Sequence, residues 1–159
     1  MEFKKFATGI LIGLCPVVLS GMARSIDRDL SQHPSYSAMI GKEYKTKNDL
    51  LIYRYQGTKD LLLDQYGVGQ LPNKEQMKEK FPFSYYSVIV EGIAPAGSVF
   101  KIKRVKLEGN SDAAFIYFYA DLVSIENKKF INKEVNPSFL TDRADIPKFK
   151  PELVEEVAP

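Results

Sequence analysis

The stretch from Ser98 to Ser124 constrains the fold of this chain more than any other, because polar and apolar residues alternate on both sides of a turn. Its sequence is SVFKIKRVKL, then EGNSD, then AAFIYFYADLVS. Successive side chains point to opposite faces of a strand, and Gly109 and Asn110 accept the left-handed backbone angles of tight turns. The stretch therefore predicts a β-hairpin.

The second arm of this hairpin has one wholly apolar face. The residues of that face are Ala114, Ile116, Phe118, Ala120 and Leu122, and those of the opposite face are Phe115, Tyr117, Tyr119 and Asp121. The first face is suited to line a core. The second face is aromatic but mostly carries polar groups, so it tolerates partial exposure to solvent.

The first arm changes its apolar phase near Lys103. Phe100 and Ile102 share one face of an ideal strand, whereas Val105 and Leu107 share the opposite one. One extra residue at Lys103-Arg104, a β-bulge, restores a single inward face. Because barrels and strongly bent sheets use such bulges, the pattern favours a curved sheet.

Residues 1–23 have the composition of an export signal. Lys4 and Lys5 precede a mostly apolar run, and small residues at Gly21 and Ala23 flank Met22 as a signal peptidase requires. We therefore expect export to the periplasm or the exterior, with no membrane span after cleavage. Two alternatives remain open: an uncleaved N-terminal anchor, and a lipoprotein that uses Cys15, although Leu14 stands where a small residue is needed.

The rest of the chain is predicted to form one domain, from 42 to 142, between a flexible leader (24–41) and a poorly ordered tail (143–159). Leu50–Tyr55 has apolar residues on both faces, which is typical of a strand covered on both sides. The long insertion 56–83 contains one short helix, with Asn73 and Gln76 spaced as a capping box. The fold class is all-β: a small, partly open barrel of about five or six strands.

The order of these elements resembles the bacterial Src-homology-three-like barrels of exported proteins. The residues that carry the likeness are Asp49–Arg54, Ile93–Ile102 and Phe115–Tyr119. The resemblance implies a small exported β-barrel that binds cell-wall peptides. Relative to that pattern, the aromatic strand lacks tryptophan and 56–83 is inserted.

No catalytic signature accompanies the hairpin. Glu75 and Glu79 lie four residues apart among lysines, which is typical of a solvated surface. Ser98 has no histidine near it in sequence, and His33 is the one histidine of the chain. Cys15 is the one cysteine, so a mature chain would have no disulfide and no thiolate metal ligand. We therefore expect no enzyme activity, no metal and no cofactor.

Two groups on the hairpin are the candidate binding residues. The aromatic row is Phe115, Tyr117 and Tyr119, and the basic group is Lys101, Lys103 and Arg104 within a run that ends at Lys106. The aromatic row offers flat apolar area with hydroxyl groups, unless the insertion 56–83 packs over it. The basic group suits an anionic partner, unless it is a solvated face that discourages edge pairing.

The expected function is non-catalytic binding in the bacterial envelope, through the outer face of the 98–124 hairpin. The partner would be a wall glycopeptide or an anionic polymer. The alternative is an inhibitor or immunity-type protein that blocks a hydrolase in the same compartment. The formal net charge of +2 gives no steering toward nucleic acid, and we expect a monomer.

Overall fold

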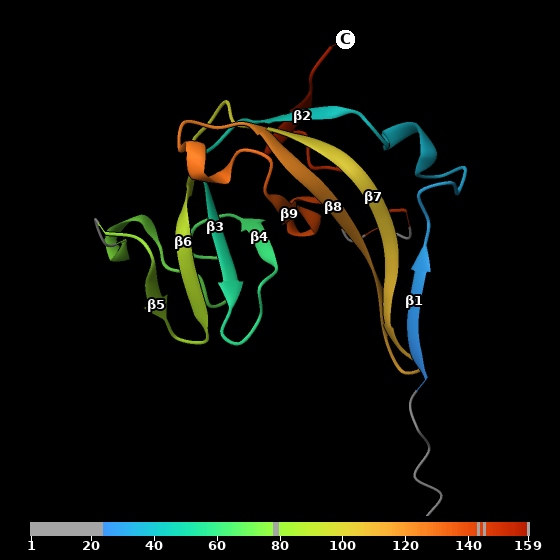
Figure 1. The fold of residues 1–159 in the computed structure, drawn as a ribbon, viewed down its shortest axis with the longest axis horizontal. Helices are drawn as coiled ribbons and strands as arrows, with labels where there is room; N and C mark the ends of the chain where they lie inside the picture. The colour runs from blue at the N-terminus through green and yellow to red at the C-terminus, as the bar shows by residue number, and fades with distance from the viewer. Residues whose placement is uncertain (1–23, 78–79, 143, 145, 159) are drawn as a thin grey trace, which may run out of the picture.

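The computed structural model describes residues 24–77, 80–142, 144 and 146–158 and shows an all-β fold (Figure 1). The expected export signal lies outside the described residues. The strands are β1 (Ser25–Asp29), β2 (Glu43–Thr46), β3 (Leu50–Tyr55), β4 (Leu61–Asp64), β5 (Phe83–Tyr85), β6 (Val88–Ala94), β7 (Val99–Asn110), β8 (Ala114–Ser124), β9 (Glu134–Asn136) and β10 (Val154–Glu156). The 3-10 helices are η1 (Ser37–Met39), η2 (Lys74–Gln76), η3 (Lys128–Phe130) and η4 (Ser138–Leu140).

All these strands join one sheet that curls into a half-barrel. The order is β10-β2-β7-β8-β9-β4-β3-β6-β5, and β1 pairs with β7 beside β2. In Figure 1 the long strands β7 and β8 arch from β2 down to β1, while β3, β6 and β5 lie on the other side. The all-β class and the partly open, curled sheet are confirmed. The strand count of about five or six is wrong, because the described residues form a sheet of ten strands.

The hairpin is confirmed together with its bulge. β7 and β8 pair antiparallel from Val99–Ser124 to Gly109–Ala114, and the register shifts between Ile102 and Arg104. The shift lets Val105 pair with Phe118 on the same face as Phe100. All three of these side chains are buried in the main core, so the extra residue gives β7 one continuous inner face.

β3 is covered on both faces, as its sequence predicts. Leu50 and Ile52 belong to the main core inside the curled sheet. Leu51 and Tyr53 belong to a second cluster on the other face, which includes Leu71, Phe83, Val88 and Val90. The insertion supplies the cover, with Tyr66, Met77 and Phe81 packed against this cluster.

The insertion therefore packs mainly over β3 and β6. Its short helix is η2, and the predicted capping box is present: Asn73 Oδ1 accepts from the Gln76 N–H at 2.9 Å, and the Asn73 N–H donates to Gln76 Oε1 at 3.1 Å. The stretch 83–94 forms two antiparallel strands, because Tyr86 adopts a left-handed φ of 48° that turns the chain.

Both ends of the expected domain need correction. The leader 24–41 is part of the domain, because β1 pairs with β7 from Ser25–Asn110 to Asp29–Lys106, and Tyr36 is buried in the main core. The expected tail also contributes to the sheet, because its residues Val154–Glu156 form β10, which pairs with β2, and Leu153 is buried in the main core.

Candidate functional site

The hairpin register brings the predicted binding residues to one face of β7 and β8. Arg104 pairs with Tyr119 across the two strands, and Lys106 and Glu108 pair with Tyr117 and Phe115. Lys103, which lies at the bulge, reaches the same face, because its Nζ is 3.2 Å from Asp121 Oδ1. This is the face opposite the core.

Carboxylates neutralise the basic run on this face. The pairs are Lys101 with Glu43 at 3.7 Å, Lys103 with Asp121 at 3.2 Å and Glu134 at 3.5 Å, Arg104 with Glu134 at 2.7 Å, and Lys106 with Asp27 at 2.8 Å and Glu108 at 3.6 Å. Partly exposed pairs of this kind contribute little to stability. An anionic partner at this face would compete with carboxylates that are already in place.

Tyr119 is held within the same network. Its hydroxyl donates to both carboxylate oxygens of Glu108 at 2.9 Å, and the Arg104 guanidinium lies 4.6 Å from its ring centroid. Burial, followed by the hydrogen bond to Glu108, raises the pKa of Tyr119 well above its usual range. Tyr119 therefore orders this face, and its hydroxyl already has a partner.

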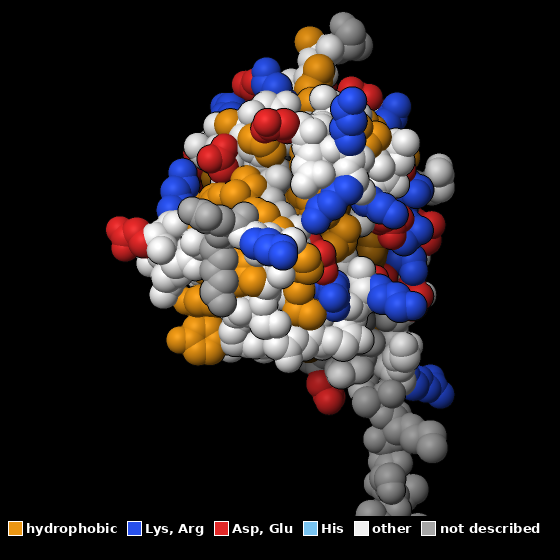
Figure 2. Space-filling model, turned by 60° about the vertical axis from the view of Figure 1, so that its left-hand side comes forward, with side chains coloured by type: hydrophobic (Ala, Val, Ile, Leu, Met, Phe, Trp, Pro, Cys, Tyr) orange, Lys and Arg blue, Asp and Glu red, His pale blue; other side chains and the backbone are white. Residues whose placement is uncertain are grey.

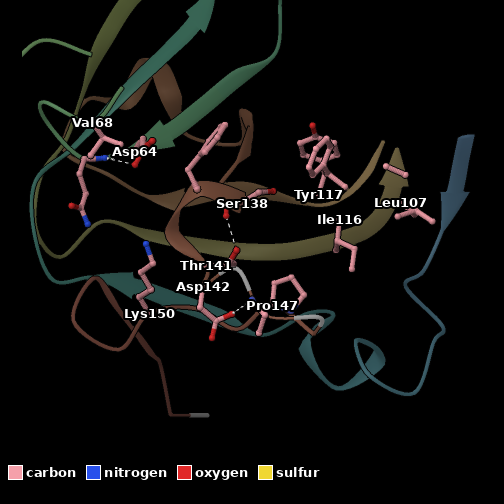
Figure 3. Close-up of a pocket in the computed structure, with 15 residues that line it drawn as sticks. Asp64, Val68, Leu107, Ile116, Tyr117, Ser138, Thr141, Asp142, Pro147 and Lys150 are labelled. Carbon is pink, nitrogen blue, oxygen red and sulfur yellow. Dashed lines mark hydrogen bonds between the residues drawn. The ribbon is translucent and has the colours of Figure 1, made fainter. Parts of the chain in front are cut away.

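Phe115 and Tyr117 belong to a different feature, a groove of about 890 Å³. The other residues that line it are Asp64, Gln65, Val68, Leu107, Ala114, Ile116, Ser138, Phe139, Thr141, Asp142, Ala144, Pro147 and Lys150. Figure 3 shows Tyr117 and Ile116 leaving β8 on opposite sides of the strand. Because consecutive residues of β8 line it, the groove follows the edge of β8, and Leu107 of β7, the partner of Ile116, extends it over one side of the hairpin.

The backbone N–H and C=O groups of successive residues in β8 point alternately to the two edges of the strand. The Asn110 N–H donates to Ala113 O across the hairpin turn at 2.9 Å, so odd-numbered residues of β8 bond to β7. Even-numbered residues bond away from β7: the Phe118 N–H donates to Ser138 Oγ at 2.8 Å, and the Leu122 N–H donates to Lys133 O at 3.0 Å.

Among the residues that the structure describes, the groove edge of β8 has no partner near the hairpin tip. β9 pairs with β8 at Ala120 and Asp121 alone. No strand of the described part of the chain pairs with this edge between residues 114 and 117. The N–H and C=O groups of Ala114 and Ile116 therefore point into the groove, where an added strand would bond to them.

The free edge exists because β9 stops early. Pro137 has no N–H to donate to a ladder, and Asn136 Oδ1 accepts the Ser138 N–H at 2.9 Å, which turns the chain into η4. The Thr141 hydroxyl then donates to Ser138 O at 2.7 Å. The described residues of this stretch that line the groove are Ser138, Phe139, Thr141, Asp142, Ala144 and Pro147.

Exposed apolar side chains gather at this groove. Phe115 is 60% exposed, Val68 45% and Phe139 42%, and each lines it. They come from β8, from the insertion and from η4. A large apolar side chain that stays in water makes no contribution to the core, so a cluster of them marks an interaction surface.

The end of the groove near β4 is polar. The Asp64 side chain is only 6% exposed, and its Oδ1 accepts the Gln65 N–H at 2.7 Å. Burial raises the pKa of Asp64 to about 6, while that hydrogen bond and the positive charge of Lys150 oppose the rise. In Figure 3 Lys150 extends toward this end from the opposite wall.

Sequence reasoning found two of the groove residues, Phe115 and Tyr117, and missed the groove itself. The sequence contains a local indication of Asp64, because this carboxylate directly follows the apolar run Leu61–Leu63. A signal also existed for Phe139, which follows the strand-ending Pro137-Ser138. No local pattern reports that β9 leaves part of β8 unpaired, because that depends on partners distant in sequence.

Two searches of the described residues bear on metals and membranes. They include no cluster of three or more His, Cys, Asp or Glu side chains placed to hold a metal ion. Among them, no helix has the length and apolar character needed to cross a membrane. Comparison of the chain with protein-family models, curated proteins and solved structures gave no match.

Proposed function

We propose that this protein is an exported, non-enzymatic binding protein whose groove holds an extended segment of a partner polypeptide beside β8. The observation that carries the proposal is the unpaired edge at Ala114 and Ile116. A peptide that adds a strand there gains main-chain hydrogen bonds, and side-chain contacts on both sides of the strand give specificity. Export rests on the sequence of residues 1–23.

The edge lacks the features that prevent free strand edges from pairing with other chains in most proteins. Free edges are usually protected by lysine, proline, a bulge or a covering segment. Here the edge residues are Ala114, Phe115, Ile116 and Tyr117, with no charge and no proline. The other edge of the hairpin is covered, because β1 and β2 both pair with β7. An uncovered apolar edge of this kind favours a partner that completes it.

The groove suits one extended chain better than a second copy of this protein. Phe139 and Pro147 bound it opposite the strand edge. A second copy of β8 would arrive with β7 bonded to its other edge and would meet this wall. A single segment of about four residues, at about 3.3 Å per residue, matches the free edge from Ala114 to Tyr117.

The same geometry favours a protein partner over an envelope polymer at the hairpin. The lysines and Arg104 that would attract an anionic polymer already have carboxylate partners. Main-chain donors and acceptors in the groove match a polypeptide. Of the functions considered from the sequence, an inhibitor or immunity-type protein acting on an exported hydrolase agrees best with this chemistry.

The test begins with a displayed library of short linear peptides, selected on the protein. The enriched peptide is then titrated against Ile116→Ala and Ile116→Pro. Both variants lose the same side chain, but only proline removes the N–H that points into the groove. We expect Ile116→Pro to bind at least about tenfold more weakly than Ile116→Ala, the cost of about one hydrogen bond.

Three outcomes would overturn the proposal. The first is equal affinity of the two variants for the peptide. The second is a library that enriches no peptide. The third is light scattering that shows a dimer which Ile116→Pro dissociates, because a second copy would then occupy the edge. Circular dichroism confirms that both variants remain folded.

A further inference from the structure

A second depression, of about 700 Å³, lies between the end of β3 and η3. It is lined by Arg54, Gly57, Thr58, Lys59, Leu61, Glu91, Lys129, Phe130 and Lys133. Four of these side chains are cationic and one is a carboxylate. In Figure 2 Lys and Arg side chains form a loose band across the middle and right of the surface, with hydrophobic side chains between them.

The carboxylate of this basic pocket is already engaged. Glu91 Oε1 lies 2.8 Å from Arg54 Nε, and an Arg54 terminal nitrogen donates to Thr58 O at 3.0 Å. Arg54 therefore ties β3 to β6 and to the turn that follows β3. Its positive charge is compensated by Glu91, which leaves the three lysines as the net charge of the pocket.

The three lysines have no acidic partner among the residues whose positions are described. Within the described part of the chain, no carboxylate oxygen lies within 4.0 Å of Lys59, Lys129 or Lys133. This is the reverse of the hairpin, where Lys101, Lys103 and Lys106 each have one. The lysines also come from separate segments, Lys59 before β4 and the other two at η3, and the fold brings them around one depression.

Packing fixes the position of η3 and of one ammonium group. The Phe130 ring is buried in the core against Gly92, where an added Cβ would lie 2.7 Å from a ring carbon. Lys129 Nζ lies 4.5 Å from the centroid of that ring and donates to Glu91 O at 2.9 Å. The cation–π contact and the hydrogen bond hold the Lys129 charge at the rim of the pocket in the absence of a ligand.

We propose that this pocket binds a linear polyanion, a chain with negatively charged groups at short intervals. A single small anion gains little from one exposed ammonium group, because such pairs contribute on the order of 0–1 kcal/mol. A ligand that spans the pocket engages three lysines at once and adds their contributions. The volume of about 700 Å³ also exceeds what one small anion would fill. This site is separate from the groove beside β8.

The experiment titrates a fluorescent polyphosphate chain into the full protein at low and high salt. The test variant is Lys59→Gln with Lys133→Gln. The control is Lys101→Gln with Lys103→Gln, which removes the same charge from the hairpin, where each lysine has a carboxylate partner. Thermal unfolding checks that both variants keep their stability, since all four side chains are exposed.

We expect polyphosphate to bind the native protein with an affinity that falls as salt rises. The test variant should bind at least about tenfold more weakly, and the control should stay within about twofold. Inorganic phosphate should not compete at equal phosphate concentration. Equal loss in both variants, binding that is unchanged in the test variant, no binding at all, or binding to anionic phospholipid vesicles alone would each overturn the proposal.

Discussion

The backbone N–H of Phe118 donates to Ser138 Oγ across 2.8 Å, in the place where the next strand of a sheet would accept it. Ser138 thus closes the edge of β8 at the point where β9 has already ended. Toward the hairpin tip no described residue provides such a substitute, and the groove begins there. One hydroxyl group separates the closed part of the edge from the open part.

Replacing Ser138 with Ala should destabilise the domain by about 1–3 kcal/mol, because the N–H of the fully buried Phe118 loses its acceptor. Urea unfolding measures the change. Ser111→Ala in the exposed hairpin turn is the control and should cost less than about 0.5 kcal/mol. If the two variants are equally stable, the bond does not close the edge.

Phe118→Ala should cost about 3–5 kcal/mol, because the ring is fully buried between Tyr36 and Phe149. Phe115→Ala should cost less than about 1 kcal/mol, since Phe115 is largely exposed. Thermal and urea unfolding compare the two. A Phe115 variant as unstable as the Phe118 variant would mean that Phe115 is part of the core and not of a binding surface.

Asp64 makes stability depend on pH in a definite direction. Its pKa is about 6 in the folded protein and about 3.9 in the unfolded chain, so ionisation is less favourable when the chain is folded. The contribution of Asp64 to stability is therefore fully present below about pH 4 and is lost as pH rises through 6. The loss is about 2–3 kcal/mol.

Asp64→Asn should remove that dependence, because an amide has no charge to bury and still accepts the Gln65 N–H. We expect the variant to be more stable than the native protein near pH 7.5 and to lose this advantage near pH 4. Urea unfolding at both pH values gives the difference. A constant difference between the two proteins across this range would contradict the assignment.

Gly92→Ala should displace the ring of Phe130, since the new Cβ would lie 2.7 Å from it. Overpacking of this kind costs about 1–3 kcal/mol. Phe130→Leu in the same chain should recover part of the loss, because the shorter side chain makes room. A double-mutant cycle in urea measures the coupling between the two substitutions. Purely additive changes in the free energy of unfolding would show that the contact between Gly92 and Phe130 does not determine the cost.

Local pattern predicted the parts of the fold that depend on neighbours in sequence. The hairpin, the bulge at Lys103-Arg104, the two covered faces of β3 and the capping box at Asn73 all follow from residue spacing. In each case the physical cause, strand alternation or a side chain that reaches a nearby backbone group, acts within a few residues.

The parts that failed depend on distant partners. β1 is charged and short, and becomes a strand because β7 offers an open edge and Lys106 pairs with Asp27 at 2.8 Å. β10 lies near the end of the chain and pairs with β2. Neither segment has the alternating apolar pattern from which a strand is predicted.

The candidate site also has features that local sequence predicts and features that depend on distant partners. Sequence identified the aromatic and basic residues of the hairpin, but three of the carboxylates that pair with the basic ones, Asp27, Glu43 and Glu134, lie outside the hairpin. The free edge depends on where β9 ends. Since an unpaired edge is a relation between strands, single-strand patterns do not report it.

Amide hydrogen exchange along β8, followed by NMR, tests the central claim most directly. In the free protein the amides of Phe115 and Tyr117 should exchange slowly, because they bond to β7, whereas the amide of Ile116 should exchange fast. Addition of the selected peptide should slow Ile116 and leave its two neighbours unchanged. Slow exchange at Ile116 in the free protein, or no change there on binding, would contradict the account.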